Sequence, residues 1–277
     1  MIRQTKLAVF GDPIHQSLSP RIHIEFARQF DLDIDYQKIL TPAGTLAEAL
    51  SIFSSAGGVG ANITAPLKQE AFALIPQLSP HARTAGTLNT LKWDPSTQQW
   101  FGENTDGQGF LNYLQKYTSI DIAPARILLL GAGGAARALI DVLEQNLLQP
   151  LTVVNRNVEK AQDLKRYPRL ELLSYVELNR QINQTTQFDI IINATSSSLH
   201  QQLPPLDSAW LKNSIVIDLA YAHGLSTPFM EWALSHHAKS VDDGLGMLVE
   251  QAALSFALWF DNIPDSKPVY QQLRSRE

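Results

Sequence analysis

The chain has 277 residues, which is long for one small domain and suits two domains of roughly 100–200 residues each. Hydrophobic residues make up 44% of it and charged residues 18%, so there is enough apolar material for two cores. The formal net charge of -5 argues against nucleic acid or an anionic membrane as the main partner, because such surfaces select clustered Lys and Arg. Cysteine is absent, which excludes disulfides, thiolate nucleophiles and Cys-ligated metal sites.

The apolar segments of the chain are short. No stretch approaches the roughly 18 apolar residues of a membrane span, and the first residues hold only a short apolar run before a turn. We therefore expect a cytoplasmic protein.

Short β-like runs alternate with amphipathic helical segments in the first hundred residues. The runs lie at 7–10, 36–40 and 59–63, and this alternation predicts a parallel α/β layer. Each helical segment opens with a hydroxyl residue just ahead of a proline, a pattern typical of a capped first turn. The hydroxyl residues are Ser19, Thr41 and Thr64. Because ligands gather beyond the carboxyl ends of strands in open α/β sheets, Ser19 and Thr64 become site candidates.

The rest of the chain predicts a second α/β unit and a long buried helix. Residues 87–103 are expected to form a strand, a polar turn and a strand, with a helix beginning near Gly107. Four further β-like runs, RILLL, LTVV, FDIIIN and SIVIDL, fall within 126–222 and indicate a doubly wound unit. After 243 one helical stripe is apolar, at Leu245, Leu248, Val249, Ala252, Ala253, Phe256, Trp259 and Phe260.

A glycine-rich turn follows the apolar run at 126–130. Gly131, Gly133 and Ala136 give the GxGxxA pattern, directly after a predicted strand and directly before a predicted helix. Glycine lets the backbone turn sharply there and lets a pyrophosphate approach the helix amides. The segment predicts a dinucleotide site; the alternative is a tight strand-to-helix turn of the kind that any α/β protein contains.

The next predicted strand, at 151–154, indicates which dinucleotide is bound. NAD sites usually carry Asp or Glu at this strand end, about 20 residues beyond the glycines, to bind the ribose 2′-hydroxyl. Here Asn155, Arg156 and Asn157 follow the strand, and Lys160 lies one turn further. A guanidinium suits a 2′-phosphate dianion, which predicts NADP rather than NAD. The alternative is that Arg156 and Lys160 are solvated surface charges.

Seven motifs in order resemble those of the shikimate dehydrogenase family. They are SLSPRIH at 17–23, NITAPLK at 62–68, TLNTL at 87–91, GENTDGQGF at 102–110, GAGGAARA at 131–138, NATSSS at 193–198 and DGLGMLVEQAA at 243–253. The resemblance covers nearly the whole chain. It implies an NADP-dependent dehydrogenase that interconverts 3-dehydroshikimate and shikimate in chorismate and aromatic amino acid biosynthesis. The implied fold is α/β with two domains: a substrate domain of 1–105 and 240–277, and a Rossmann-type doubly wound NADP domain of 106–239.

The resemblance assigns catalysis to Lys68 and Asp106. Reduction of a ketone leaves negative charge on its oxygen, and an acid or a cation must meet that charge. An ammonium can supply the proton while the carboxylate orients it. The alternatives are a surface lysine for Lys68 and a helix-capping carboxylate for Asp106.

The resemblance also implies the binding residues. Those for the substrate are Ser17, Ser19, Thr64, Lys68, Asn89, Asp106, Tyr221 and Gln251. Those for the cofactor are Gly131, Ala132, Gly133, Gly134, Ala135, Asn155, Arg156, Lys160, Thr195, Leu219 and Gly244. The individual alternatives are helix caps for Ser19 and Thr64, a local turn for Asn89 and a solvent-facing side chain for Gln251. Asn157 stands where the family commonly has a hydroxyl residue after Asn-Arg.

Other functions have weaker support. The histidines show no metal-ligand spacing, so no metal is expected, and Ser196 to Ser198 lack the context of a hydrolase nucleophile. Three rivals stay open: a quinate/shikimate dehydrogenase with broader specificity, a catalytically silent nucleotide-sensing protein, and a folate-pathway dehydrogenase. We expect a monomer or homodimer with a small-molecule substrate and neither nucleic acid nor membrane as a partner.

Overall fold

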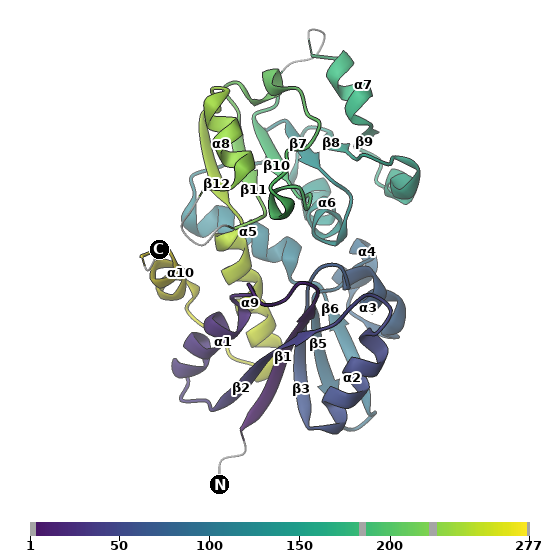
Figure 1. Ribbon diagram of the computed structural model, residues 1–277, viewed down its shortest axis with the longest axis vertical. Coiled ribbons are helices and arrows are strands. Elements are labelled where there is room, and N and C mark those ends of the chain that lie inside the picture. Colours follow the sequence, from purple (N-terminus) through teal and green to yellow (C-terminus); the bar gives the residue numbers. More distant parts are fainter. Residues whose placement is uncertain (1–3, 183–186, 222–225, 276–277) are drawn as a thin grey trace. The chain divides into compact units, whose positions relative to one another are not determined.

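The computed structural model describes residues 4–182, 187–221 and 226–275 (Figure 1). The chain divides into two compact units, each with its own six-stranded sheet. The first contains the described residues up to Phe110 together with Leu248–Ser275, and the second contains Leu111–Met247. The boundaries fall within two helices, α5 (Asp106–Tyr117) and α9 (Leu245–Phe260).

The sheet of the first unit has the order β2-β1-β3-β5-β6-β4. Its strands are β1 (Thr5–Gly11), β2 (Ile34–Leu40), β3 (Gly58–Ile63), β4 (Gln77–Leu78), β5 (Thr90–Asp94) and β6 (Gln99–Glu103). β1 is parallel to β2 and β3, as the alternation predicts, and β5 and β6 form the expected antiparallel pair. β5 is also antiparallel to β3, so its amino end meets the carboxyl ends of β3 and β6.

The core of the first unit lies on both faces of this sheet. Alternate residues of β1 point to opposite faces: Ala8 and Phe10 join one apolar cluster, and Leu7 and Val9 join another. A strand buried on both faces is apolar throughout, which is why this segment stands out in the sequence. The helices of the unit besides α5 and α9 are α1 (Ser19–Arg28), α2 (Leu46–Ser55), α3 (Lys68–Leu74), α4 (Pro80–Ala85) and α10 (Ser266–Ser275).

The hydroxyl residues ahead of the prolines do not cap helices, so that prediction is wrong. The N-cap of α1 is Leu18 in helical conformation, which places Ser19 inside the first turn. The helices α2 and α3 begin beyond Thr41 and Thr64, and none of the three helices has a side-chain cap. Pro20 does lie in the first turn of α1, as expected, whereas Pro66 follows a cis peptide bond in the turn before α3.

The second unit has the Rossmann strand order, β12-β11-β10-β7-β8-β9, with every pair parallel. Its strands are β7 (Ile127–Leu130), β8 (Leu151–Val154), β9 (Leu170–Leu173), β10 (Ile190–Asn193), β11 (Ile215–Asp218) and β12 (Ser240–Asp243). Its described helices are α6 (Gly134–Asn146), α7 (Tyr175–Arg180), α8 (Pro228–Ser235) and the 3₁₀ helices η1 (Glu159–Arg166), η2 (Ser198–His200) and η3 (Ser208–Leu211). The predicted fold class is confirmed.

Helix α9 is buried on more than the predicted stripe. Glu250 and Ser255 lie off that stripe, yet both are fully buried and hydrogen-bonded, Glu250 to Ser266 and Ser255 to the carbonyl of Gln251. Polar side chains of this helix are therefore buried in the interior, where hydrogen bonds satisfy them. None of the helices in the described ranges has the length and apolar character that crossing a membrane requires.

Candidate active site

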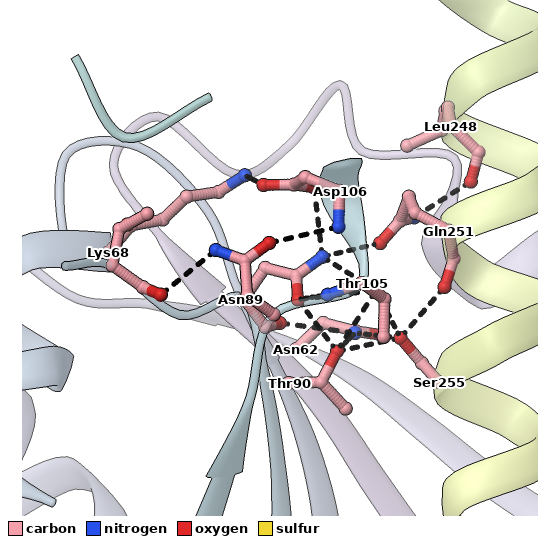
Figure 2. A network of polar contacts seen from close by, with 11 residues as sticks. Asn62, Lys68, Asn89, Thr90, Thr105, Asp106, Leu248, Gln251 and Ser255 are labelled. Atoms are coloured by element: carbon pink, nitrogen blue, oxygen red, sulfur yellow. Dashed lines mark hydrogen bonds and ion pairs between the residues drawn. The ribbon is translucent and has the colours of Figure 1, made fainter. Parts of the chain in front are cut away.

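A lysine and an aspartate form a buried ion pair at one edge of the first sheet (Figure 2). Lys68 is the first residue of α3, in the connection that leaves β3, and Asp106 is the first residue of α5, just beyond β6. The Nζ of Lys68 donates to Oδ2 of Asp106, and the side chains are only 16% and 5% exposed. The lysine side chain is mostly buried rather than a solvated surface charge, and the carboxylate points to Lys68 and to Asn89.

Asn89 fixes the other oxygen of that carboxylate. It lies at the amino end of β5, which meets the carboxyl ends of β3 and β6. Its Nδ2 lies 2.8 Å from Oδ1 of Asp106 and 2.9 Å from Oε1 of Gln251, and its Oδ1 accepts from the amide of Thr105 at 2.9 Å. These partners lie far along the chain from Asn89, so the side chain does not serve a local turn.

Gln251 enters this site from α9. Its Oε1 accepts from Asn89, and its Nε2 donates to the carbonyl of Leu248 at 2.7 Å. The residue is buried rather than solvent-facing. The structure therefore brings together four predicted residues, Lys68, Asn89, Asp106 and Gln251, from four elements of one unit (Figure 2).

A second layer of polar side chains lies beneath these residues. The Nδ2 of Asn62 donates to Ser255 Oγ at 3.1 Å, and Thr90 Oγ1 lies 2.7 Å from the same oxygen (Figure 2). The Oδ1 of Asn62 accepts from Tyr36 at 2.6 Å and from the ring of His23 at 3.1 Å. None of these second-layer side chains is among the residues predicted from the sequence. The one signal of this layer was an amide at the buried end of β3, in a run that is otherwise apolar.

His23 is neutral in this layer. Burial lowers the pKa of His23 to about 3, although its hydrogen bond with Asn62 acts in the opposite direction. Because Asn62 offers its carbonyl oxygen, the imidazole donates from Nε2. The ring also stacks on Tyr36, with centroids 4.7 Å apart.

The remaining predicted substrate residues are Ser17, Ser19, Thr64 and Tyr221. Ser17 donates its hydroxyl to Ser19 at 3.2 Å, in the connection that follows β1. Thr64 lies beside the end of β1, where its amide donates to the carbonyl of Phe10 at 2.9 Å. Tyr221 belongs to the second unit.

The glycine-rich turn of the second unit joins β7 to α6. Gly131 has a φ of +102°, which L side chains rarely adopt, so glycine is required there by conformation. Gly133 is different: it is the N-cap of α6 with a φ of -77°, and a Cβ built on it meets no atom within 4 Å. Within the described residues neither packing nor backbone conformation requires glycine at 133. The free amides of a helix start suit a pyrophosphate.

The segment after β8 carries the predicted 2′-phosphate residues. Arg156 and Lys160 are both exposed. Asn155 donates its Nδ2 to the carbonyl of Asn157 at 2.7 Å, and Oδ1 of Asn157 accepts from the amide of Lys160 at 3.1 Å. Asn157 thus orders the start of η1. Two exposed cations with no carboxylate at the strand end fit an NADP 2′-phosphate better than a ribose hydroxyl.

Three more predicted cofactor residues lie at the carboxyl ends of β10, β11 and β12. Thr195 donates its hydroxyl to Oδ1 of Asn193 at 2.7 Å, and the amide of Leu219 donates to the Asn193 carbonyl at 2.9 Å. A Cβ on Gly244 lies 2.1 Å from the carbonyl oxygen of Leu219, so only glycine fits there. The buried carboxylate of Asp218 ties this edge together by accepting from Asn193, and burial raises the pKa of Asp218.

Family models match the chain in three consecutive segments. The shikimate dehydrogenase substrate binding domain matches residues 9–91, the shikimate / quinate 5-dehydrogenase model matches 113–221, and the shikimate 5'-dehydrogenase C-terminal domain matches 244–274. The chain belongs to the shikimate dehydrogenase family. The predicted resemblance is confirmed.

Relatives within the shikimate dehydrogenase family match over almost their full length. The shikimate dehydrogenase (NADP(+)) of Colwellia psychrerythraea is 42% identical over 282 residues, which covers 99% of both chains. The crystal structure of the Thermus thermophilus shikimate 5-dehydrogenase in complex with NADP(H) and shikimate is 30% identical, with a TM-score of 0.83 over 99% of this chain and 100% of the other. An Ael1 enzyme from Pseudomonas putida is 37% identical, with a TM-score of 0.85 over 98% of both chains.

Among the described residues of this family member, no group of three or more His, Asp or Glu side chains is arranged to hold a metal ion.

Proposed function

We propose that this chain catalyses the reversible NADPH-dependent reduction of 3-dehydroshikimate to shikimate. The observation that carries the proposal is the buried Lys68–Asp106 pair, held by Asn89 in a member of the shikimate dehydrogenase family. Relatives 41–42% identical over nearly the whole chain are named shikimate dehydrogenase (NADP(+)). A catalytically silent nucleotide sensor would not require a mostly buried ion pair of Lys68 and Asp106 at the carboxyl ends of these strands.

Lys68 and Asp106 have distinct roles in the proposed reaction. NADPH, when bound, supplies a hydride to the carbonyl carbon. The ammonium of Lys68 donates a proton to the carbonyl oxygen, and in the reverse direction the neutral amine accepts it from the alcohol. Asp106 keeps the ammonium aimed and balances its charge, and Asn89 holds Asp106 by donating to its second oxygen.

The substrate residues belong, in this proposal, to the domain of 1–105 and 240–277. Ser17 and Ser19 bind the substrate carboxylate, and Ser19 is available for this because it does not cap α1. Thr64, Asn89, Asp106 and Gln251 bind hydroxyls, and Tyr221 contacts the substrate. A ring that carries several hydroxyls suits these small hydrogen-bonding groups better than a pterin, which requires apolar walls.

The cofactor residues belong to the domain of 106–239, except Gly244, which lies just after this segment of the chain. The amides of 131–135 would hold the pyrophosphate, Asn155, Arg156 and Lys160 would bind the 2′-phosphate end of the cofactor, and Thr195, Leu219 and Gly244 would complete the site. We further propose a cytoplasmic monomer or homodimer that works without nucleic acid or a membrane, in keeping with the net charge of -5.

A steady-state comparison tests the proposal directly. The wild-type protein is assayed at 340 nm with shikimate and with quinate, each with NADP and with NAD. We expect rapid reduction of NADP with shikimate and much slower rates in the other three combinations. Comparable rates with quinate support the broader quinate/shikimate enzyme, and no turnover with any combination contradicts the proposal.

A further inference from the structure

We propose that Arg137 is a positioning residue for cofactor choice, which holds the segment that carries Lys160 against the glycine-rich turn. The proposal rests on the proposed use of NADP. Arg137 lies in the second turn of α6, only 6% exposed. Its Nε donates to the carbonyl of Ala132 at 3.2 Å, and Nη1 and Nη2 donate to the two carboxylate oxygens of Asp163 at 2.5 and 2.9 Å.

One guanidinium thus joins two parts of the cofactor site. Ala132 belongs to the glycine-rich turn, and Asp163 belongs to η1, the 3₁₀ helix that begins just after Arg156 and contains Lys160. In a 3₁₀ helix, side chains three residues apart lie on the same face. Lys160 and Asp163 therefore share a face, and the bond from Arg137 to Asp163 turns that face toward the glycine-rich turn.

The contact also controls the charge on this face. Asp163 is half-exposed, and an unpaired carboxylate on the face of Lys160 would repel a phosphate dianion. The two hydrogen bonds from Arg137 hold the pKa of the Asp163 carboxyl below its ordinary value, so the carboxylate stays ionised and paired with a buried cation. Arg166 is a weaker partner, with Nη1 3.9 Å from Oδ2 of Asp163.

Arg137 does not itself serve as a phosphate ligand. Three of its nitrogen atoms already donate to Ala132 and Asp163, and the side chain is buried. It acts through Lys160 and Arg156. Because the feature that separates NADP from NAD is the 2′-phosphate, loss of Arg137 is expected to weaken NADP selectively.

The test uses Arg137→Met, which keeps the apolar stem and removes the fork. Dissociation constants for NADP and NAD are measured by titration, alongside those of the wild type. We expect NADP to bind roughly tenfold more weakly, the scale of a lost charge-assisted contact, and NAD to weaken clearly less, because of the lost bonds only the one to Ala132 concerns a turn that both cofactors use. The double variant Arg137→Met with Asp163→Asn should recover part of the loss, because the unpaired carboxylate is gone.

Arg169→Met is the matched control. Arg137 lies near the amino end of α6, and Arg169 contacts the carboxyl end of that helix by donating to the carbonyls of Glu144 and Leu147. Its loss should lower the melting temperature and leave the ratio of the two dissociation constants unchanged. If Arg137→Met does not fold, Arg137→Lys replaces it: a lysine keeps the charge but cannot span all three acceptors, and we expect a several-fold fall in the ratio.

Equal weakening of NADP and NAD in the Arg137 variant overturns the inference, because a merely structural arginine affects both cofactors alike. An unchanged ratio in Arg137→Lys overturns it as well. Failure of the proposed function has a different signature: the wild-type protein itself would show no preference for NADP. The wild-type titration is therefore completed first.

Discussion

Ser19 lies in the first turn of α1 and is buried. A serine ahead of a proline is typical of a helix cap, but the N-cap of α1 is Leu18, and the amide of Ser19 itself donates to Oγ of Ser17 at 3.3 Å. The Ser19 hydroxyl instead accepts from Ser17 and is buried. Its position is then explained better by a ligand than by the stability of the helix.

We predict that Ser17→Ala with Ser19→Ala raises the Michaelis constant for shikimate by roughly tenfold or more, as hydrogen bonds to a charged group are lost. The melting temperature should fall little compared with the change in the Michaelis constant, because the N-cap Leu18 is kept and only the long 3.3 Å bond from the Ser19 amide to Ser17 is lost at the start of α1. Ser79→Ala is the control: Ser79 does cap α4, accepting from the amide of Ala82 at 3.0 Å, so its loss should cost about 1 kcal/mol of stability with the Michaelis constant unchanged. The opposite pattern in the two variants contradicts the assignment.

The role of Arg156 is tested through the two cofactors. The guanidinium is exposed beyond β8, where an NAD site would carry a carboxylate. Arg156→Ala should weaken NADP by roughly one to two decades, the range of a charge-assisted contact, and affect NAD little. Arg180→Ala, another exposed arginine of the same unit, should alter neither dissociation constant. Equal losses for both cofactors would show that Arg156 is structural.

His23 should make the stability of the protein depend on pH. Burial lowers the pKa of His23 to about 3 in the folded state from its ordinary value of 6.5, so between these limits the unfolded chain binds a proton that the folded chain does not. Stability is therefore highest above pH 6.5 and falls as the pH decreases, by ~2 kcal/mol between pH 7 and pH 5. Denaturant unfolding of His23→Gln should show a shallower pH dependence than the wild type. A variant of the exposed His81, such as His81→Gln, should keep the wild-type slope, and an identical slope in all three proteins contradicts the prediction.

Among the helices, Gly109 and Gly133 differ in why glycine is present: Gly109 is tightly packed, and Gly133 has open space beside it. In α5, a Cβ on Gly109 lies 2.7 Å from both Cβ and the backbone nitrogen of Gln251, so α5 and α9 touch there. Gly109→Ala should destabilise the fold by roughly 1–3 kcal/mol, a typical cost of overpacking, and should disturb Gln251. Gly133→Ala has open space and an ordinary φ, so it should leave the melting temperature unchanged and weaken NADP. Melting curves and cofactor titrations of both variants check this. A stability loss in Gly133→Ala would contradict the ligand explanation of that glycine.

Elements with strong periodicity could be predicted from the sequence, and elements at the edges could not. The buried strand β8 matches the predicted run at 151–154, and β7 differs from its predicted run by one residue at the start. The strands β9 and β12 lie at the two edges of the Rossmann sheet, are partly exposed, and have no continuous apolar run to reveal them.

The residues of the candidate site also differ in how far the sequence could predict them. Residues in distinctive motifs, such as Lys68 and Asp106, could be named from the sequence through resemblance. The supporting layer of Asn62, His23 and Ser255 could not be predicted. These side chains come together only through contacts between β3, α1 and α9, and periodicity does not predict such contacts.

At the scale of the whole molecule, the first unit is discontinuous. Its sheet is built before the Rossmann unit in the chain, and α9 and α10 return to it afterwards. Helix α9 makes specific hydrogen bonds to the first unit. Trp259 donates to the carbonyl of Leu91 at 2.9 Å, and Gln251 accepts from Asn89, which also donates to Asp106. Local sequence patterns carry no information about such distant contacts, whereas the order of the family motifs does.

In the proposed reaction Lys68 transfers the proton and Asp106 holds the Lys68 ammonium in place. Turnover and the shikimate dissociation constant are measured with NADP for Lys68→Ala, Asp106→Ala and the double variant. Lys68→Ala should lower turnover by roughly 10²–10⁴-fold with little change in shikimate affinity, and Asp106→Ala should reduce both. The double variant should be scarcely worse than the single variants, because the pair works as one unit. Wild-type turnover in Lys68→Ala would contradict the account.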